Sequence, residues 1–462
     1  MTPEGMEVIM KIIIVGCGKV GATLAEQLCD EDHELVIVDK NPTKIQQLSE
    51  SIDVMGVTGN GSSIHILSEA GVEEADILIA VTGSDELNLL CCLIAKKVSN
   101  CHTIARVRNP VYNKEVHFIQ KMMGISMIIN PEFAAATEMS RLLRFPSAIK
   151  LDTFSKGRVE LLKFKLLPEF HLGGMTIAQI MEKLRCDILV CGVEREEKVY
   201  IPSGNFVLKD QDRISIIASP ENSSKFFSKV GIHTQQVKSA LIIGGGTLSY
   251  YLASSLLRMR IKVSIIEINE ERCEELSELL PEANIVCGDA TDKKLLLEEG
   301  LVNAEAFVTL TNFDEENILL SLFAKKVSSA KLITKVNRIS FDDIVEGLDL
   351  GSIIYPRYIT ADYILRYVRA MGNSLGSNVE TLYHILDGQA EALEFAVKET
   401  PNVTGVPLSQ LDLKDNLLIA CINRSRQIMI PRGQDTIQPG DTVIVVTTIK
   451  GLKDLKDVLK KR

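Results

Sequence analysis

The chain has 462 residues, 46% of them hydrophobic and 24% charged, an ordinary composition for a globular protein that predicts roughly three domains at about 150 residues each. Lysine and arginine number 51 against 61 acidic residues, and the formal net charge of −10 disfavours a protein that binds nucleic acid through its phosphates. A membrane span of about 18 apolar residues is also not expected, because Gly, Lys or Asp interrupts every candidate run.

Strand-like and helical segments alternate from the start of the chain to Arg144. Helices are expected to begin near Gly18, Pro42, Ser63 and Glu86, and an amphipathic helix covers Glu132–Arg144. The apolar strands between them are predicted at 11–15, 35–39, 54–57, 77–81, 103–107 and 127–129. Nearly continuous apolar strands that alternate with helices are typical of a parallel sheet covered by helices on both faces.

From Leu151 the pattern changes to short strands separated by turns. Strands are predicted at 161–166, 188–193 and 213–218, with one helix near Ile177–Leu184. These segments predict a small β-rich α+β module of about 80 residues. Whether it binds a ligand is open at this stage, because Arg195, Arg213 and Arg424 are either phosphate contacts or ordinary exposed arginines on strand edges.

The whole pattern then occurs a second time. The segment from Gly16 matches that from Gly244, residues 80–88 match 309–317, and residues 201–204 match 430–433. A period of about 225 residues indicates duplicated domains rather than a solenoid. We therefore predict an α/β protein of two units, each a Rossmann-like doubly wound parallel sheet followed by a small β-rich α+β module. The predicted boundaries are 10–130 and 238–355 for the sheets, 131–150 and 356–378 for the crossover helices, and 151–232 and 379–460 for the small modules.

The first glycine-rich loop has the spacing of a dinucleotide site. Asp39 ends the second strand, and the loop itself follows a strand, opens a helix and reads Gly16-Cys17-Gly18-Lys19-Val20-Gly21. Glycines let backbone N–H groups approach a pyrophosphate at the positive end of a helix, and the aspartate accepts from ribose hydroxyls. Because an acid here disfavours a 2′-phosphate, the sequence favours NAD over NADP, with an empty structural turn as the alternative.

The second copy keeps part of this motif. Gly244 and Gly246 are retained, Ser249 stands in place of the third glycine, and Glu267 stands in place of the aspartate. Serine is small enough for close packing of helix on strand, so we predict a second nucleotide site. The alternative is that this copy has lost its ligand.

Further polar residues follow the strands at the edge where ligands bind in this fold. They are Asn60, Thr82 and Arg106 in the first copy and Asp289, Thr311 and Lys335 in the second. The arginine and the lysine are candidate phosphate contacts, or else solvated charges at the rim. Residues 82–88 contain Thr, Ser, Asp, Glu and Asn in a pattern that largely recurs in the second copy, and helix capping is the alternative explanation for it.

Ten cysteines raise the question of a metal site. No two have C-x-x-C spacing, and the seven histidines are scattered. Most of the cysteines lie in apolar runs, so we expect buried, reduced thiols and no metal site.

With these motifs the chain resembles the tandem-RCK regulatory subunit of the bacterial Trk potassium-uptake system. The resemblance extends from Met10 to about Lys460 and depends on the doubled module order and on the motifs at 59–62, 80–88 and 104–107. It implies that the Rossmann-like modules bind NAD(H), with ATP or ADP as further ligands. Carried over by position, the first site comprises Gly16, Gly18, Gly21, Asp39, Asn60, Thr82 and Arg106, and the second comprises Gly244, Gly246, Glu267, Asp289 and Thr311.

The same resemblance implies partners and a location. Members of this family form a homo-oligomer, a dimer or a tetrameric ring, on the cytoplasmic face of the membrane, and they bind a separate membrane-embedded subunit that conducts potassium. A nucleotide would then shift the population of module arrangements and so gate that subunit. The helices after each sheet would pack between neighbouring domains, or else within their own domain, through Leu142, Leu143, Phe145, Tyr363, Leu365 and Val368.

Two other functions stay open at this stage: a nucleotide-sensing partner of another ion transporter, and a nicotinamide-dependent oxidoreductase. An oxidoreductase needs a proton donor or acceptor beside the nicotinamide, and a domain that holds its substrate. The candidates His65 and His102 fall on a helix and before a strand, where surface or capping roles are commoner. The small modules are also too β-rich to resemble a typical substrate domain, so we predict a protein without enzymatic activity.

Overall fold

The computed structural model of the chain divides into two compact units. One comprises Met1–Ser140 and Lys238–Val368, and the other comprises Arg141–Val237 and Arg369–Arg462. The corresponding modules of the two copies are thus grouped together in each unit. The structure describes residues 9–29, 31, 33–144, 150–154, 158–196, 198–231, 237–337, 347–348, 350–374, 379–385, 389–398, 400, 402–425, 427–449, 452 and 454–460.

The first Rossmann-like module is a six-stranded parallel sheet in the order β3-β2-β1-β4-β5-β6. Its strands are β1 (Lys11–Val15), β2 (Glu34–Asp39), β3 (Met55–Thr58), β4 (Ile77–Ala80), β5 (His102–Arg106) and β6 (Met127–Ile129). Its helices are α1 (Lys19–Cys29), α2 (Pro42–Ser49), α3 (Ile64–Glu69), α4 (Asp85–Val98), α5 (Pro110–Lys114), α6 (Val116–Met123) and α7 (Pro131–Arg144). The chain turns from one side of the sheet to the other between β1 and β4, so the loops after these strands diverge and form a crevice.

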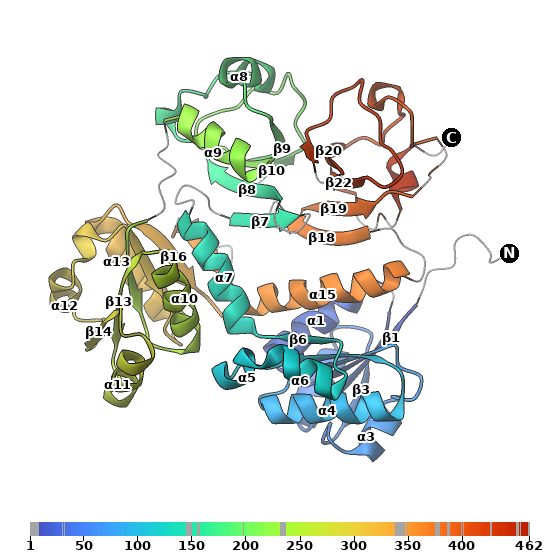
Figure 1. Ribbon diagram of the computed structural model, residues 1–462, viewed down its shortest axis with the longest axis vertical. Helices are drawn as coiled ribbons and strands as arrows, with labels where there is room; N and C mark the ends of the chain where they lie inside the picture. The colour runs from blue at the N-terminus through green and yellow to red at the C-terminus, as the bar shows by residue number, and fades with distance from the viewer. Residues whose placement is uncertain are drawn as a thin grey trace. The chain divides into compact units, whose positions relative to one another are not determined.

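Both faces of the central strands β1, β2 and β4 are buried, which explains why these strands are almost continuously apolar. Ile13, Val36 and Leu78 belong to one core cluster with Leu67 of α3 and Cys92 of α4. Figure 1 shows α3 and α4 beside this sheet. Right-handed crossovers place α1 and α2, which precede β2 and β3, on the opposite face. The predicted parallel sheet between two layers of helices is confirmed.

The second module repeats this topology in the order β14-β13-β12-β15-β16-β17, with every pair parallel. Its strands are β12 (Ser239–Ile243), β13 (Lys262–Glu267), β14 (Asn284–Cys287), β15 (Ala306–Thr309), β16 (Lys331–Lys335) and β17 (Ser352–Ile354). Its helices include α10 (Thr247–Arg258), α11 (Glu270–Leu279), α12 (Lys293–Glu298), α13 (Asp314–Val327) and α15 (Pro356–Ser374). The duplication predicted from the sequence is therefore also a duplication of fold.

The two Rossmann-like modules of this unit contact each other directly. Tyr251 of α10 reaches the first module, where Asn130 Nδ2 donates to its hydroxyl at 3.0 Å and the ring of Phe133 lies edge-on with 5.5 Å between centroids. Elsewhere at the junction, the hydroxyl of Tyr367 on α15 lies 3.0 Å from His102 Nδ1. The helices of one copy thus rest on strand ends of the other.

The second unit consists of two antiparallel sheets. One has the order β10-β9-β11-β8-β7 and comprises β7 (Lys150–Phe154), β8 (Val159–Lys165), β9 (Ile188–Arg195), β10 (Lys198–Tyr200) and β11 (Arg213–Ala218), with α8 (Ile177–Leu184) and α9 (Pro220–Lys229). The other has the order β18-β19-β22-β20-β21 and comprises β18 (Val379–Ile385), β19 (Ala390–Ala396), β20 (Leu417–Arg424), β21 (Gln427–Met429) and β22 (Thr442–Thr447). The two sheets share one apolar core, which includes Phe154, Cys191, Cys421 and Val446.

Two of the arginines considered as phosphate contacts in these modules form internal ion pairs. Arg195 donates to both oxygens of Asp212, at 2.8 and 2.7 Å, and Arg424 donates to both oxygens of Asp441, at 2.9 and 2.7 Å. Each arginine also donates to a nearby backbone carbonyl. These paired, geometrically fixed guanidinium groups connect β9 to the turn before β11 and β20 to the turn before β22.

The structure adds several elements that the sequence analysis did not contain. They are α5 and α6 between β5 and β6, the edge strands β7 and β10, and α9 at the end of the first small module. The apolar residues expected on the crossover helices, Leu142, Leu143, Leu365 and Val368, are buried within this single chain. Phe145 lies outside the described residues. In the part of the chain that the structure describes, no helix combines the length and the apolar character needed to cross a membrane.

All ten cysteines are free thiols, and seven of them are buried. Burial raises the pKa of the Cys91 thiol to about 12, because a thiolate is poorly solvated there. Cys287 is exposed, so the expectation of buried thiols is wrong at this position. Among the described residues, no group of three His, Cys, Asp or Glu side chains is placed to hold a metal ion.

Candidate nucleotide site

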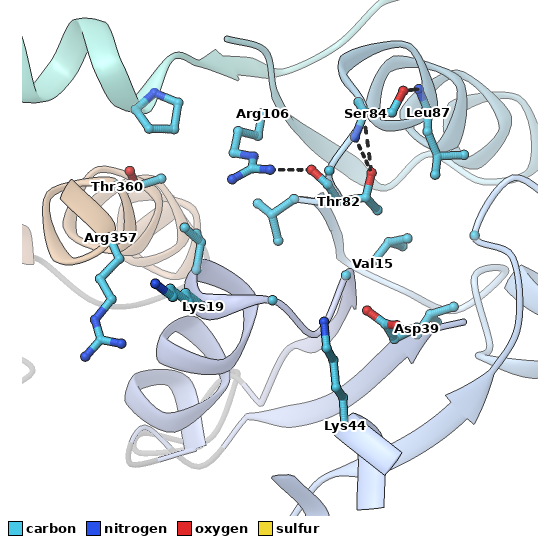
Figure 2. Close-up of a pocket in the computed structure, with 18 of the residues that line it drawn as sticks. Val15, Lys19, Asp39, Lys44, Thr82, Ser84, Leu87, Arg106, Arg357 and Thr360 are labelled. Atoms are coloured by element: carbon cyan, nitrogen blue, oxygen red, sulfur yellow. Dashed lines mark hydrogen bonds between the residues drawn. The ribbon is translucent and has the colours of Figure 1, made fainter. Parts of the chain in front are cut away.

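A cleft of about 590 Å³ lies at the crevice of the first sheet, beside the carboxyl ends of β1, β2, β4 and β5 (Figure 2). This volume is within the range of small-molecule sites. Seven residues predicted for the first nucleotide site line the cleft: Gly16, Gly18, Lys19, Val20, Asp39, Thr82 and Arg106. The fold thus brings together residues from four separate strand ends.

The glycine loop passes very close to its neighbours. Gly16 has φ +111°, and a Cβ at this position would lie 3.0 Å from the backbone nitrogen of Thr82. A Cβ at Gly21 would overlap the carbonyl oxygen of Gly16, so this glycine lets α1 pack against the loop. Gly18 has open space around it and leads into α1. The first and third glycines are therefore required by packing, while the second leaves room beside the helix N-terminus.

Three predicted residues are not among those that line the cleft: Cys17, Gly21 and Asn60. The backbone N–H of Cys17 donates to Asp39 Oδ2 at 2.6 Å, so this residue fixes the loop relative to β2. The side chain of Asn60 accepts from its own turn, at Ser62 N, at 3.3 Å. These residues shape the wall and do not face the space inside.

Asp39 connects the loop to the next strand. Besides the bond from Cys17, its Oδ1 accepts from the backbone N–H of Asn41 at 2.9 Å. The carboxylate thus has a fixed orientation at the edge of the cleft. An oriented carboxylate that retains free lone pairs is suited to accept hydrogen bonds from the hydroxyls of a ribose.

The recurring Thr and Asn of residues 82–88 form an internal clamp. Asn88 is fully buried; its Oδ1 accepts from Thr82 N at 2.8 Å and from Thr82 Oγ1 at 2.7 Å, and its Nδ2 donates to the Arg106 carbonyl at 2.8 Å. In the second copy, Asn317 makes the same contacts with Thr311 and Lys335. This clamp connects the loop after the fourth strand to the end of the fifth.

Helix capping explains the rest of that motif in the first copy. Ser84 caps α4 by accepting from Leu87 N at 3.2 Å, and Asp85 Oδ2 accepts from the backbone N–H groups of Arg108 and Asn109, both at 2.8 Å. The motif is therefore mainly structural. Its contribution to the site is to hold Thr82 and Arg106 at the cleft wall.

The lining of the cleft is cationic although the chain as a whole is acidic. Burial lowers the pKa of the Arg106 guanidinium, to which the nearby charge of Arg108 adds, and burial raises the pKa of the Glu132 carboxyl. Among the described lining residues, five cations face two carboxylates: Lys19, Lys40, Lys44, Arg106 and Arg357 against Asp39 and Glu132. This arrangement attracts an anion of more than one charge.

Arg106 lies at the wall of the cleft rather than in solvent. Its guanidinium donates to the carbonyl of Thr82, and its Nε is buried without a hydrogen-bond partner among the described residues (Figure 2). A buried guanidinium with an unused N–H gains from an anionic acceptor. Arg106 is therefore a partly buried charge of the cleft wall and not a solvated charge at the rim.

The second copy repeats the backbone of the glycine loop and its acid but lacks two of the cations. Gly244 has φ +94°, Glu267 accepts from Gly245 N at 2.5 Å and from Asn269 N at 2.8 Å, and the hydroxyl of Ser249 donates to the carbonyl of Gly244. The equivalents of two cleft lysines of the first copy are Thr247 for Lys19 and Ile268 for Lys40, and Ile268 is exposed.

The remaining predicted residues of the second copy have internal partners. Gly246 precedes α10 with open space around it, and Thr311 belongs to the clamp with Asn317. Asp289 accepts from Thr291 within its own turn, and these hydrogen bonds lower the pKa of its carboxyl. Lys335 is largely buried, which lowers the pKa of its amine, and it donates to the carbonyl of Leu310 at 3.2 Å. Among the described residues, the second glycine loop and the strand ends beside it therefore present fewer cations to a phosphate than the first.

The two histidines considered for catalysis lie outside the cleft lining. His65 is exposed on α3, and His102 faces Tyr367 at the junction of the two modules. Burial lowers the pKa of His102.

Sequence reasoning missed part of the cleft. Lys44 and Glu132 face it from the first copy, and Asn337, Arg357 and Thr360 face it from the second. Alignment of the two copies could have pointed to Arg357, because it follows Pro356 at the start of α15 as Glu132 follows Pro131 at the start of α7. No short-range pattern in the sequence indicates that residues of the second copy line the cleft of the first.

The matches to protein families cover most of the chain. Residues 12–131 and 240–356 match the TrkA-N domain, and residues 162–231 and 392–460 match the TrkA-C domain. A Trk system potassium uptake protein TrkA homolog of Archaeoglobus fulgidus is 33% identical over 451 residues, which cover 98% of this chain and 100% of the relative. A Trk system potassium uptake protein TrkA of Halomonas elongata is 31% identical over 459 residues, with 97% and 98% covered.

Solved structures with the same fold include the RCK domain of GsuK, with a TM-score of 0.62 at 20% identity over 96% of this chain and 93% of that one. A structure of the GsuK channel bound to NAD has a TM-score of 0.61 at 19% identity, over 96% of this chain and 77% of that one. At these identities the likeness is one of fold, and it extends across all four modules.

Proposed function

This chain belongs to the TrkA family of Trk-system potassium uptake proteins, and from that premise we propose that it is the nucleotide-sensing regulatory subunit of a potassium-transport system. The family membership confirms the resemblance drawn from the sequence. The observation that carries the proposal is the cleft of the first copy, where a glycine loop, an oriented aspartate and a cationic lining occur together. We also propose that the chain divides into its modules and crossover helices at the boundaries predicted from the sequence.

NAD(H) is the ligand we propose for this cleft, with ATP or ADP as the second candidate. Its pyrophosphate would meet the glycine loop and the start of α1, Asp39 would hold a ribose, and Arg106 would contact a phosphate. The loop fits such a group, because Gly16 and Gly21 admit no side chain while Gly18 leaves space beside the helix. The nicotinamide ring can carry a hydride, but we propose that the protein senses the nucleotide and does not catalyse a reaction with it.

The second glycine loop would hold a further nucleotide through Gly244, Gly246, Glu267, Asp289 and Thr311. Its backbone geometry supports this, and its smaller number of cations argues for a weaker contact with phosphates. The stoichiometry of a titration decides between one and two nucleotides per chain.

The proposed partner is a separate membrane-embedded subunit that conducts potassium. The names of the relatives, all Trk-system potassium uptake proteins, support this choice over a partner of another ion transporter. The protein would act as a homo-oligomer, a dimer or a tetrameric ring, at the inner face of the cell membrane. A nucleotide gates the partner only by binding one arrangement of the modules more tightly than another.

Calorimetric titration of NADH and of ATP into the full chain tests this function. Asp39→Asn keeps an oxygen for the Cys17 N–H but removes the charge, and Asp39→Ala removes both. We expect each to lower the NADH affinity by tenfold or more, about 1.4 kcal/mol. Asp53→Ala, at an exposed aspartate of the same module outside the cleft lining, is the matched control.

Absence of binding tighter than millimolar for both nucleotides would contradict the sensing function. The oxidoreductase alternative is checked separately, because it predicts that NADH absorbance falls in the presence of candidate substrates, whereas a sensor leaves it constant.

A further inference from the structure

The cleft of the first copy is closed on one side by the second copy. Asn337 follows β16, and Arg357 and Thr360 lie in the first turns of α15, yet all three line the same cleft as Gly16 and Asp39. Figure 2 shows Arg357 and Thr360 on α15, on the side of the cleft where Lys19 begins α1. The glycine loop and the aspartate thus come from one copy and the facing helix from the other.

Arg357 is a cation with unused hydrogen-bonding capacity at this wall. Its guanidinium lies 5.1 Å from the centroid of the Tyr358 ring, a stacking contact that limits its motion. Its Nε is buried and has no hydrogen-bond partner among the described residues. A buried N–H of this kind costs free energy unless an acceptor fills the space beside it.

The position of Arg357 is occupied by an acid in the other copy. Glu132 follows Pro131 at the start of α7, as Arg357 follows Pro356 at the start of α15, and both side chains face this one cleft. An anionic ligand is repelled by Glu132 and attracted by Arg357 at equivalent points. The second copy therefore supplies a charge that the first copy lacks at this place.

A neighbouring contact of the junction is filled rather than open. Tyr251 of α10 packs edge-on against Phe133 and accepts a hydrogen bond from Asn130, residues that flank Pro131 and Glu132 of the cleft lining. Burial raises the pKa of Tyr251 to about 12, so its hydroxyl remains neutral. The residue equivalent to Tyr251 in the first copy is Thr23, a much smaller side chain. The two copies thus contribute different side chains to the junction.

We infer that a nucleotide in this cleft is bound by both copies of the duplicated unit, with Arg357 of the second copy contacting its phosphates. The inference rests on the proposed function and adds a residue and a mechanism to it. The contact with Arg357 exists only while α15 lies beside the first glycine loop. A ligand bound there favours that arrangement of the two sheets over any in which they separate.

The test is a titration of NADH, and separately of ATP, into the full chain carrying Arg357→Gln. The matched control is Arg366→Gln, on the same helix but outside the cleft lining. Arg357→Lys keeps a positive charge without the forked guanidinium geometry, and it also guards against a folding defect of the glutamine variant. Hydrogen exchange of residues 356–368, with and without saturating NADH, reports directly on the second copy.

We expect Arg357→Gln to bind tenfold or more weakly, Arg357→Lys to lose less, and Arg366→Gln to match the wild type. We also expect NADH to slow exchange at the start of α15 in the wild type and not in Arg357→Gln. If the wild type binds while Arg357→Gln stays within twofold of it and exchange at α15 is unchanged, this inference is wrong and the proposed function stands. If the wild type binds neither nucleotide, this inference and the proposed function are both wrong.

Discussion

The clamp centred on Asn88 leads to a prediction whose magnitude follows from the structure. Asn88 is fully buried and makes four hydrogen bonds, to Thr82 N at 2.8 Å, Thr82 Oγ1 at 2.7 Å, Thr82 O at 3.4 Å and Arg106 O at 2.8 Å. Asn88→Ala removes the partner of a backbone N–H and of a carbonyl. At about 1–3 kcal/mol for each of these two unsatisfied buried groups, we expect the free energy of unfolding to fall by about 2–6 kcal/mol.

The duplicated fold supplies the matched control for this change. Asn317 is also fully buried and makes the corresponding bonds at 2.9, 2.9, 3.1 and 3.0 Å, so Asn317→Ala should destabilise the chain by a similar amount. Thr82 and Arg106 line the first cleft, and therefore we expect Asn88→Ala to weaken NADH binding there as well, whereas Asn317→Ala should leave binding at this first site unchanged. Urea unfolding followed by circular dichroism measures the change in stability, and calorimetry measures the change in NADH affinity.

Two results would refute this reasoning. A loss of stability below about 1 kcal/mol for Asn88→Ala would mean that the clamp is replaced by water or by local rearrangement. A loss of NADH affinity in Asn317→Ala as large as that in Asn88→Ala would mean that the clamp acts on binding through general stability and not through the position of Arg106.

Two further predictions concern the loop and the buried acid. Gly21→Ser should lower the free energy of unfolding by about 1–3 kcal/mol and the NADH affinity about tenfold, because its Cβ would overlap the Gly16 carbonyl oxygen. At the equivalent position, Ser249→Gly should lower the free energy of unfolding by only about 1 kcal/mol, since one hydrogen bond is lost. Urea unfolding and NADH titration of both variants check these values. Burial raises the pKa of Glu132 in the folded chain, so its contribution to stability is full below the ordinary pKa of glutamate and is lost as the pH rises through the folded pKa. Glu132→Gln should therefore gain stability relative to the wild type between pH 5 and pH 8 in urea unfolding, and an unchanging difference between the two proteins would contradict the assignment.

Local patterns in the sequence were sufficient to predict the layered architecture. The strands of each parallel sheet are apolar on both faces because helices cover both, and this produces runs such as Lys11–Val15 that are recognisable without a structure. The position of Gly16 and the acid at Asp39 are also set by short-range geometry, since a turn with φ +111° strongly favours glycine. The duplication is a comparison of the sequence with itself and needs no coordinates.

Some short elements were not predicted from the sequence. The helix α6 has only 8 residues, none of them buried, and the edge strand β10 has only three residues. Their formation depends on neighbouring segments, which local patterns do not contain.

The roles of individual polar residues at the site were decided by contacts between distant parts of the chain. Thr82 and Asn88 recur in both copies whether they bind a ligand or hold a loop, and only their mutual hydrogen bonds distinguish the two roles. The sequence is compatible with Arg195 as a phosphate contact, but in the structure its Nε and Nη2 donate to the two carboxylate oxygens of Asp212.

The participation of Arg357 shows this limit most clearly. The residue lies more than three hundred positions from Gly16, and no local pattern records that α15 packs beside α1. Backbone preferences and hydrophobic periodicity act over a few residues, so the sequence by itself determined the two sheets, their order of elements and the glycine loops. Which side chains share a cleft depends on how those finished modules pack together, and that was decided only by the tertiary structure.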